Sequence, residues 1–336
     1  MLSKKQNLLE CIHGGSPDRY VKQFEAFSPM LRADYPALSP VDELGISRDE
    51  WGVWWQSAGL PGRIPMHDMS HRVIKELDKW RRFVNPPGGW DRLGIWDGLK
   101  RRADAIDQDE VFLTVWVSPG VFERTTNLME MAEALMALYE EPECLHELID
   151  CITEVELEQA EAICKHIQPE VIFHHDDWGS DLNTFMSVDM FDEFLADSYR
   201  KIYGYYKSNG VQVICHHCDS YAATLVDHMV DFGIDVWQGG VVSNDIPSLV
   251  KKYQGKLAFM TGVEAQVVDR YDWSKQLVDD AVSAAIAGVG SKTSFIPCIT
   301  SGAPGSIYPG VYDAIDESIE KASERDFPAS ELMLSA

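Results

Sequence analysis

Long apolar runs are missing from this sequence of 336 residues. No stretch comes close to the ~20 apolar residues that a membrane-spanning helix requires. The first seven residues, Met-Leu-Ser-Lys-Lys-Gln-Asn, lead into a short mixed helix and lack the apolar core of a signal peptide. We therefore expect a soluble protein without a membrane partner, and we expect its location to be cytoplasmic.

Basic residues are also scarce. The chain has 29 Lys and Arg against 54 Asp and Glu, which gives a formal net charge of -25. A surface of this sign repels nucleic acid and anionic membranes, so we expect neither as a partner. Solubility is the simplest reason for the charge. The alternative is an acidic face that docks a partner with a complementary patch.

A disulfide framework is not expected, because the seven cysteines are an odd number in a large chain without a secretion signal. Cys144, Cys151 and Cys164 lie in one amphipathic stretch, as small buried hydrophobic residues do. A Gly-x-Gly-x-x-Gly turn from strand to helix is missing as well. Residues 288–293 lack the order of a phosphate-binding loop and precede a strand. These absences count against a doubly wound nucleotide-binding sheet.

What the chain does contain, from about residue 110 onward, is a regular alternation of two kinds of segment. Short β-branched or aromatic runs, typical of buried parallel strands, occupy residues 111–117, 171–174, 211–215, 234–237, 257–260 and 293–298. Amphipathic segments follow them at 127–166, 187–209, 220–232, 246–253, 273–287 and 311–322. This alternation predicts an α/β fold and favours a (β/α)8 TIM barrel formed by one domain, residues 1–336. With residues 23–27 as the first strand, seven of the barrel's strands are placed.

Residues 28–110 interrupt the alternation and are rich in Trp, Pro and Gly. No separate core-forming period is visible, so we interpret this region as an elaborated cap over the barrel mouth. Its aromatic residues, including Trp54 and Trp55, either pack over the barrel end or line a substrate pocket. We list Trp54, Trp55, Trp178, Gln238 and Tyr308 as candidate substrate-binding residues.

A candidate metal site follows the strand at 211–215. His216 and Cys218 are two positions apart, so their side chains point the same way on an extended chain. Cys298 ends another predicted strand, and the carboxyl ends of barrel strands meet at the active-site face. One imidazole and two thiolates are a ligand set that catalytic zinc uses, with one position left open. The alternatives are a redox-active pair of Cys215 and Cys218, or buried residues with a structural role only.

A second polar cluster, with Asp176 and Asp177, follows the strand at 171–174. Adjacent residues of an extended chain point in opposite directions, so at least one of these acids should cap a helix or orient another group. Gln238 and Glu264 also follow predicted strands. Either is a candidate for a fourth zinc ligand or for a hydrogen bond to a zinc-bound atom. Asp176, Asp177 and Glu264 are the candidate catalytic residues.

These residues resemble the uroporphyrinogen decarboxylase-like superfamily, and within it the corrinoid-dependent methyltransferases. The resemblance spans almost the whole chain. It begins with Ser16-Pro-Asp-Arg19 and continues through Asp176-Asp-Trp-Gly179, His216-x-Cys218 and Cys298. In the methylcobalamin:coenzyme M methyltransferases, a His-x-Cys motif and a distant Cys bind zinc. The resemblance implies the same role for His216, Cys218 and Cys298.

The departures from these families are informative too. The decarboxylase carries an Arg-Gln-Ala-Gly-Arg element after its first strand, whereas residues 24–32 read Phe-Glu-Ala-Phe-Ser-Pro-Met-Leu-Arg. The coenzyme M enzymes carry Gly where this chain has Asp219. Together with the Trp-rich cap, these features resemble the O-demethylase methyltransferases of anaerobic metabolism, which pass the methyl group of methoxylated aromatics to a corrinoid protein.

The resemblance therefore implies a zinc-dependent enzyme that moves a methyl group between a small substrate and the cobalt of a corrinoid (cobalamin) carried by a partner protein. A methoxylated aromatic ether is the expected substrate. The first alternative is a methylcobalamin:thiol methyltransferase of the coenzyme M type. The others are a decarboxylase-like lyase and a non-catalytic corrinoid-binding protein, with His216 or His217 as the axial ligand.

Overall fold

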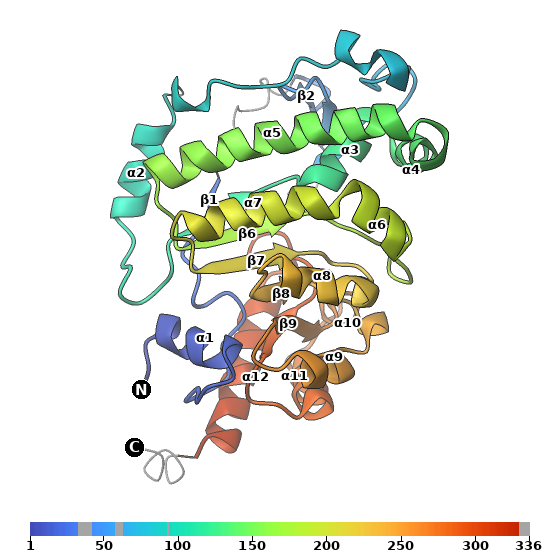
Figure 1. Cartoon of the computed structure of the whole chain (residues 1–336). Coiled ribbons are helices and arrows are strands. Elements are labelled where there is room, and N and C mark those ends of the chain that lie inside the picture. The colour runs from blue at the N-terminus through green and yellow to red at the C-terminus, as the bar shows by residue number, and fades with distance from the viewer. Residues whose placement is uncertain (33–41, 58–62, 93, 329–336) are drawn as a thin grey trace.

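Seven parallel strands form the central sheet of the protein (Figure 1). The computed structural model describes residues 1–32, 42–57, 63–92 and 94–328. The strands follow one another in chain order across the sheet, and each pairs in parallel with the next. They are β1 (Leu31–Arg32), β5 (Thr114–Val117), β6 (Val171–His175), β7 (Val213–His217), β8 (Val236–Gln238), β9 (Ala258–Val263) and β10 (Phe295–Ile299).

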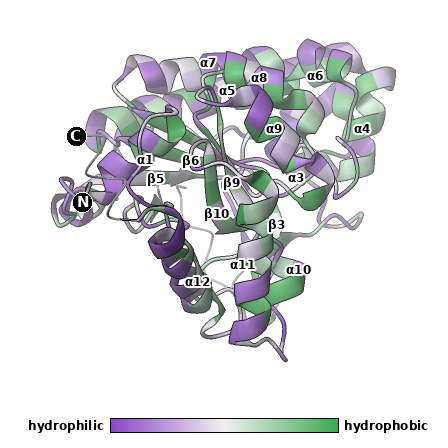
Figure 2. Cartoon of the chain, turned by 90° about the horizontal axis from the view of Figure 1, so that it is seen from below, coloured by the Kyte–Doolittle hydropathy of each residue, from purple (hydrophilic) through white to green (hydrophobic). Residues whose placement is uncertain are grey.

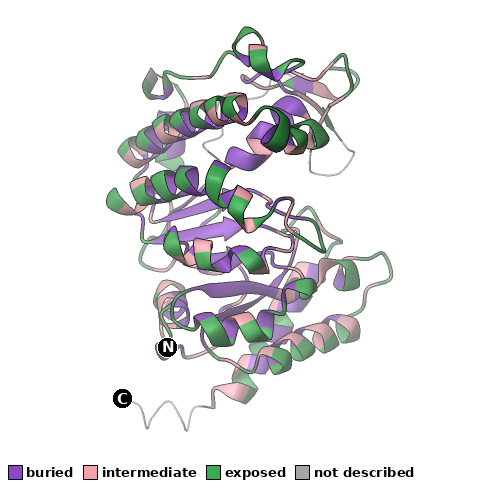
Figure 3. Ribbon diagram, turned by 45° about the vertical axis from the view of Figure 1, so that its right-hand side comes forward, coloured by how far each residue is buried: buried purple, intermediate pink, exposed green. Residues whose placement is uncertain are grey.

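Helices connect the strands and cover the outer face of the sheet. Figure 3 shows buried strands behind helices whose outer turns are exposed. The connecting helices are α3 (Val121–Met129), α4 (Met131–Glu140), α5 (Pro142–His166), α6 (Val188–Phe194), α7 (Ala196–Ser208), α8 (Val226–Asp231), α9 (Ile246–Tyr253), α10 (Ala265–Val268) and α11 (Lys275–Val289), with short 3-10 turns η3 (Ala223–Leu225) and η4 (Val242–Asn244). The predicted α/β alternation is confirmed, and the architecture is that of the expected TIM barrel.

The two ends of the chain meet at the edge strands of the sheet. In α1 (Lys4–Ile12), the Cys11 thiol donates a hydrogen bond to the Phe295 carbonyl on β10 at 3.5 Å. The Gln23 side chain accepts a hydrogen bond from the Ile299 amide, also on β10, at 3.3 Å. Phe27 forms a parallel bridge with Phe112, just before β5. The segment before β1 therefore spans from β10 to β5, which brings the edges of the sheet together as a barrel requires.

The predicted first strand at residues 23–27 is wrong. Gln23 has a positive φ of 44°, and the residues after it form hydrogen-bonded turns, with Glu25 N bonded to Lys22 O and Phe27 N to Phe24 O. A strand needs φ near -120° throughout. The aromatic residues of this segment therefore lie in turns, and the first strand of the sheet is β1. The amphipathic stretch at 127–166 also divides. Glu130, with φ 85°, ends α3 and begins α4, and Pro142 begins α5.

The cap region contains a small antiparallel sheet and, after it in the chain, three short helical segments. The sheet is β2 (Ile46–Arg48), β3 (Trp54–Ser57) and β4 (Arg63–Pro65). It contacts α3 through an ion pair of 2.8 Å between Asp49 and Arg124. The later elements are η1 (Leu77–Arg82), η2 (Trp90–Arg92) and α2 (Trp96–Asp104). η1 and η2 pack against α5, while α2 contacts β1 and begins beside the end of α5, where Trp96 stacks on His166 with ring centroids 4.9 Å apart. Only part of the predicted cap therefore lies near the strand ends.

The final helix, α12 (Val311–Asp326), packs against α11 and β10. Figure 2 shows hydrophilic residues over much of its visible face, while Val311, Ile315 and Ile319 are buried. The buried apolar side chains of the described residues form one continuous cluster that includes Trp51 and Val53 of the cap region. Among the helices that the structure describes, none has both the length and the apolar character needed to span a membrane.

Candidate functional site

Two histidine pairs lie side by side at the carboxyl ends of β6 and β7. In the parallel register, His174 is opposite His216 and His175 is opposite His217. Side chains alternate along a strand, so each pair sends one imidazole to either face of the sheet. His174 and His216 both contact the Tyr203 hydroxyl on α7, at 3.0 and 2.9 Å. These two histidines therefore face the helices, and His175 and His217 face the barrel interior.

The helix-facing histidines belong to a buried polar network. Glu156 on α5 contacts His174 Nε2 at 2.5 Å, and Tyr203 bridges His174 to His216. The ring of Trp178 stacks on His216 with centroids 4.1 Å apart. Burial, followed by the neighbouring histidines, holds the pKa of His216 well below its usual value. His216 is thus a neutral imidazole enclosed between the sheet and α7.

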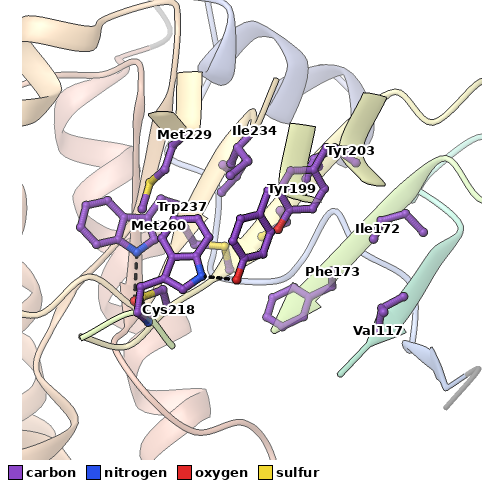
Figure 4. Close-up of a cluster of buried hydrophobic side chains, with 14 of the residues drawn as sticks. Val117, Ile172, Phe173, Tyr199, Tyr203, Cys218, Met229, Ile234, Trp237 and Met260 are labelled. Carbon is purple, nitrogen blue, oxygen red and sulfur yellow. Dashed lines mark hydrogen bonds between the residues drawn. The ribbon is translucent and has the colours of Figure 1, made fainter. Parts of the chain in front are cut away.

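Cys218 lies on the same side as His216. Its sulfur accepts a hydrogen bond from the Trp178 amide at 3.4 Å and contacts Ser220 Oγ at 2.9 Å. The Trp237 indole donates to the Cys218 carbonyl at 2.9 Å, and Tyr199 and Tyr203 of α7 lie close by (Figure 4). Burial raises the pKa of the Cys218 thiol well above its usual value. The Cys218 thiol is therefore enclosed on the helix side of the sheet, together with His216.

Cys298 lies on the other face of the sheet. Cys298 is paired with Gly262 on β9. Gly262 and Met260 are two residues apart and point to the same face of the sheet, and Met260 is paired with Gln238 on β8. Gln238 in turn pairs with His217 on the interior side. The predicted ligands His216 and Cys218 therefore face the helices, while Cys298 faces the interior. The structure does not bring these three residues together, and another set of side chains meets at the strand ends.

That set, which we call the mouth cluster, consists of Glu123, His175, Asp177, His217 and Asp219. Within the described parts of the chain, two groups of three metal-ligating side chains have all their ligand atoms within 4.8 Å of one another. One is Glu123, His175 and Asp177, and the other is Asp177, His217 and Asp219. Imidazole nitrogens and carboxylate oxygens are ligands for zinc and other divalent transition metals. The cluster therefore has the donor chemistry of a metal site.

Short contacts hold the mouth cluster in place. His175 Nδ1 lies 2.9 Å from Glu123 Oε2, and the rings of His175 and His217 stack with centroids 4.5 Å apart. Asp177 Oδ1 accepts a hydrogen bond from the Asp219 amide at 2.9 Å. Trp116 on β5 stacks on His175, with ring centroids 5.9 Å apart, and meets Phe173 in a tilted contact with centroids 4.9 Å apart. Aromatic side chains thus form one wall beside the cluster.

The two interior histidines have opposite electrostatic environments. Burial, and then the proximity of His175, lowers the pKa of His217 to about 4. Burial acts in the same direction on His175, but the hydrogen bond to Glu123 and the charges of Asp177 and Asp219 raise its pKa to about 9. Burial, and then the charges of Asp219 and Glu123, raise the pKa of Asp177 well above its usual value. The neighbouring carboxylates thus raise the pKa of both His175 and Asp177, and a cation would relieve this excess of negative charge.

Asp176 points away from the mouth cluster and caps α3. Its carboxylate accepts hydrogen bonds from the Phe122 amide at 3.0 Å, the Glu123 amide at 2.8 Å and the Tyr199 hydroxyl at 2.5 Å. Burial, and then the charge of Glu123, raises the pKa of Asp176 to about 7. A Cβ on Gly120 would lie 2.5 Å from the Asp176 carboxylate, so only glycine fits at this N-cap. The expectation that the two adjacent acids point in different directions is confirmed.

The other predicted site residues are spread over the molecule. Trp55 donates from its indole to Asp49 at 3.1 Å, while Trp54 meets His71 edge to face at 5.7 Å within the cap region. Trp178 is fully buried against α7. Glu264 is the N-cap residue of α10 and is half-buried, which raises its pKa. Tyr308 is exposed in the segment after β10. Glu264 and these aromatic residues lie outside both groups of the mouth cluster.

Gln238 does reach the interior site, where it orients His217. Its side-chain amide donates to the carbonyls of Ile299 and Thr300 at 3.2 and 3.3 Å, which directs its oxygen toward His217 Nδ1. The hydrogen on Nδ1 is then donated to Gln238 Oε1, so that the lone pair lies on Nε2, 3.9 Å from Asp219 Oδ2. Carboxamides and carboxylates commonly orient metal-binding imidazoles in this way.

The sequence did not predict that Glu123, His175 and Asp219 belong to this cluster, and it indicated His217 only as an alternative axial ligand of a corrinoid. Two signals were present in the sequence. β6 and β7 each end in a His-His pair, and Asp219 lies two residues after the second pair. Neither signal says which histidine of a pair faces the interior, because that depends on contacts from α5 and α7. Glu123 has no local signal, since it enters the site on the first turn of α3, about 50 residues before His175 in the chain.

Residues 95–297, more than half of the chain, match the family model described as uroporphyrinogen decarboxylase (URO-D). The chain belongs to this family. Among solved structures, it is similar to a methyltransferase from Methanosarcina mazei, with 15% sequence identity and a TM-score of 0.68, covering 96% of this chain and 99% of that one. An L-ribulose 3-epimerase structure matches at 10% identity and a TM-score of 0.42, over 70% of this chain and 83% of that one. No curated protein matches the sequence significantly.

The URO-D assignment confirms the family that the strand-end residues resemble. The likeness to the methanogen methyltransferase extends over nearly the full length of both chains and supports the same barrel fold.

Proposed function

We propose that this URO-D family member is a metal-dependent methyltransferase. It moves the methyl group of a small substrate, an aryl methyl ether, to the cobalt of a corrinoid carried by a partner protein. The observation that carries the proposal is the mouth cluster of imidazoles and carboxylates at the strand ends, beside the aromatic wall of Trp116 and Phe173. The methyltransferase among the similar structures supports the reaction class.

The donor set of the mouth cluster fits zinc, with nitrogen and oxygen ligands in place of the predicted thiolates. Asp177, His217 and Asp219 would hold the ion, and His217 Nε2 already presents its lone pair to the two carboxylates. A bound zinc supplies a Lewis acid that stabilises negative charge on a leaving oxygen. Gln238 fixes the ring of His217, and Asp176 fixes the backbone of Glu123. The site is thus held rigid by groups that do not themselves touch the ion.

The aromatic wall favours an aryl ether over a small thiol. The ring of Phe173 contacts Trp116 on one side and Phe24 on the other, and the ring centroids of Phe24 and Phe173 are 6.0 Å apart. Trp116 Nε1 is buried and has no hydrogen-bond partner among the described residues. It is therefore a donor that an oxygen atom of the substrate would satisfy. Flat apolar walls with one or two directed polar groups are typical of sites for aromatic ligands.

The exposed surface around the strand ends favours a protein partner. Large apolar side chains are exposed in the segments that follow β6, β8, β9 and β10, namely Leu182, Val242, Val267, Tyr271 and Tyr308. Hydrogen bonds connect these segments in pairs, from Ser243 Oγ to the Asp181 carbonyl at 2.5 Å and from the Tyr308 amide to Asp269 at 2.7 Å. Exposed apolar side chains that gather around a site are typical of docking surfaces. A corrinoid protein seated there would bring its cobalt to the mouth cluster.

The test is anaerobic methyl transfer from a panel of methoxylated aromatics and methylated thiols. The acceptors are free cob(I)alamin and the cognate corrinoid protein, and the absorbance of the methylated corrinoid is followed. We expect turnover with methoxyaromatics, faster by orders of magnitude with the corrinoid protein because docking positions the cobalt. His217→Ala should abolish transfer, whereas His13→Ala, an exposed histidine after α1, should leave it unchanged.

Methyl transfer with thiols alone would favour the coenzyme M-type alternative. Absence of transfer with every donor, from protein that contains its metal, would refute the proposed function. Equal rates with free cobalamin and with the corrinoid protein would refute the docking surface while leaving the chemistry intact.

A further inference from the structure

The mouth cluster is too extended for one metal ion. Ligand bonds of about 2.0–2.2 Å place any two ligand atoms of a single ion within about 4.4 Å of each other. The five side chains do not satisfy even a limit of 4.8 Å as one group, and among the described residues they divide into two groups of three. Asp177 is the member that both groups share. A carboxylate with two oxygens is suited to contact two ions at once.

The two imidazoles lie on different sides of Asp177. His217 joins Asp177 and Asp219, and its Nε2 is directed at them because Gln238 holds Nδ1. His175 joins Asp177 and Glu123, with Nδ1 2.9 Å from the Glu123 carboxylate. The rings stack at 4.5 Å between centroids, so each group has an imidazole of its own.

The charge of the cluster also calls for more than one cation. Glu123, Asp177 and Asp219 place three carboxylates in a half-buried position. Glu123 forms an ion pair with His175 at 2.9 Å, and Asp219 lies 3.9 Å from His217. Arg124, the basic residue next to Glu123, is paired with Asp49 at 2.8 Å in the cap region. Two divalent ions would balance three carboxylates and leave one positive charge to attract a leaving oxygen anion.

We infer that the mouth cluster is a binuclear metal site, in which Glu123 and His175 hold one ion, His217 and Asp219 hold the other, and Asp177 bridges the two. The inference rests on the metal that the proposed function assigns to this cluster, and it extends that assignment from one ion to a pair. The half of the site with Glu123 depends on α3, whose first turn Asp176 fastens to β6. The half with His217 and Asp219 depends on the end of β7 and on Gln238 of β8, which holds the ring of His217.

The experiment compares metal content in variants that each remove one half. Metal-free protein is titrated with Zn2+, passed through a desalting column and measured by elemental analysis. We expect two ions per wild-type chain, one in Glu123→Gln, one in Asp219→Asn and none in Asp177→Asn. Asp189→Asn, an exposed acid in the first turn of α6, is the matched control and should retain two. Circular dichroism melts verify that each variant folds. The two single-half variants decide the question even if Asp177→Asn does not fold.

Electron paramagnetic resonance with Mn2+ in place of zinc shows whether the ions are adjacent. We expect an exchange-coupled signal in the wild type and an uncoupled signal in Glu123→Gln and Asp219→Asn. Saturation of the wild type at one ion, or two ions without coupling, would overturn the inference. Because methyl transfer is not part of this measurement, two coupled ions in a protein without transferase activity would refute the proposed function and leave the binuclear site standing. One ion in an active enzyme would do the reverse.

Discussion

Asp176 and Asp177 are adjacent acids of the same chemistry, and the structure predicts opposite consequences when each is replaced by Asn. The Asp176 carboxylate accepts from the amides of Phe122 and Glu123 and from the Tyr199 hydroxyl. Asn keeps one acceptor oxygen and replaces the other by an NH2 group, so that at least one buried donor loses its partner. Asp177 makes one hydrogen bond, to the Asp219 amide, and otherwise faces the ligands of the mouth cluster.

The expected loss of stability in Asp176→Asn is about 1–3 kcal/mol, the cost of leaving one buried donor unsatisfied. The cost of ionising Asp176, whose pKa burial raises to about 7, disappears in the variant and offsets part of this loss. An unfolding entropy of about 2.1 cal/mol/K per residue amounts to roughly 0.7 kcal/mol/K for 336 residues. The melting temperature should therefore fall by ~1.5–4 °C.

The assay is a pair of measurements on both variants: thermal melts by circular dichroism and metal content after desalting. Asp176→Asn should melt earlier and retain most of its metal, whereas Asp177→Asn should melt close to the wild-type metal-free protein and lose metal and methyl-transfer activity. A melting temperature unchanged in Asp176→Asn, with its metal lost, would show that this acid serves the site and does not cap α3. Equal loss of activity in both variants with unchanged melting would refute the division of roles.

Three further predictions follow from the placement of single side chains. Cys298→Ala should retain all of its zinc, whereas His217→Ala should lose the ion held by Asp177, His217 and Asp219, as measured by elemental analysis, because His217 and not Cys298 belongs to the mouth cluster; full zinc in His217→Ala would favour the thiolate ligand set. Gln238→Ala should weaken zinc binding by ~10–100-fold in a competition titration with a chromophoric chelator, because the ring of His217 loses its orienting partner. Burial raises the pKa of Asp316 from 3.8 to about 6, so the folded state favours its protonated form and loses stability as the pH rises through this range. Asp316→Asn keeps an acceptor oxygen for Gln23. Between about pH 4 and 6 its melting temperature should fall less than that of the wild type, and melting temperatures that change in parallel with pH would contradict this prediction.

The sequence was sufficient for the architecture because each strand and helix carries its own local pattern. The runs at 171–174 and 211–215 correspond to β6 and β7, and their β-branched and aromatic residues are buried on both faces, as in other parallel sheets. The family was also recognisable from the motifs at the strand ends, and the family model that matches residues 95–297 confirms it. The first strand was misplaced at residues 23–27, because a single left-handed residue, Gln23, turns an aromatic alternation into a turn.

Only the tertiary structure decided which residues of each strand end meet in the mouth cluster. Side chains alternate with a period of two along a strand, so His174 and His175, or His216 and His217, exchange faces if the strand shifts by one residue. Tyr203 on α7 and Glu156 on α5 select His174 and His216 for the helix side, and both come from other parts of the chain. The same register sends Cys298 to the face opposite Cys218. A local pattern predicts that polar residues gather at a strand end, but the direction of each side chain depends on what packs against the strand, and that is a property of the folded chain.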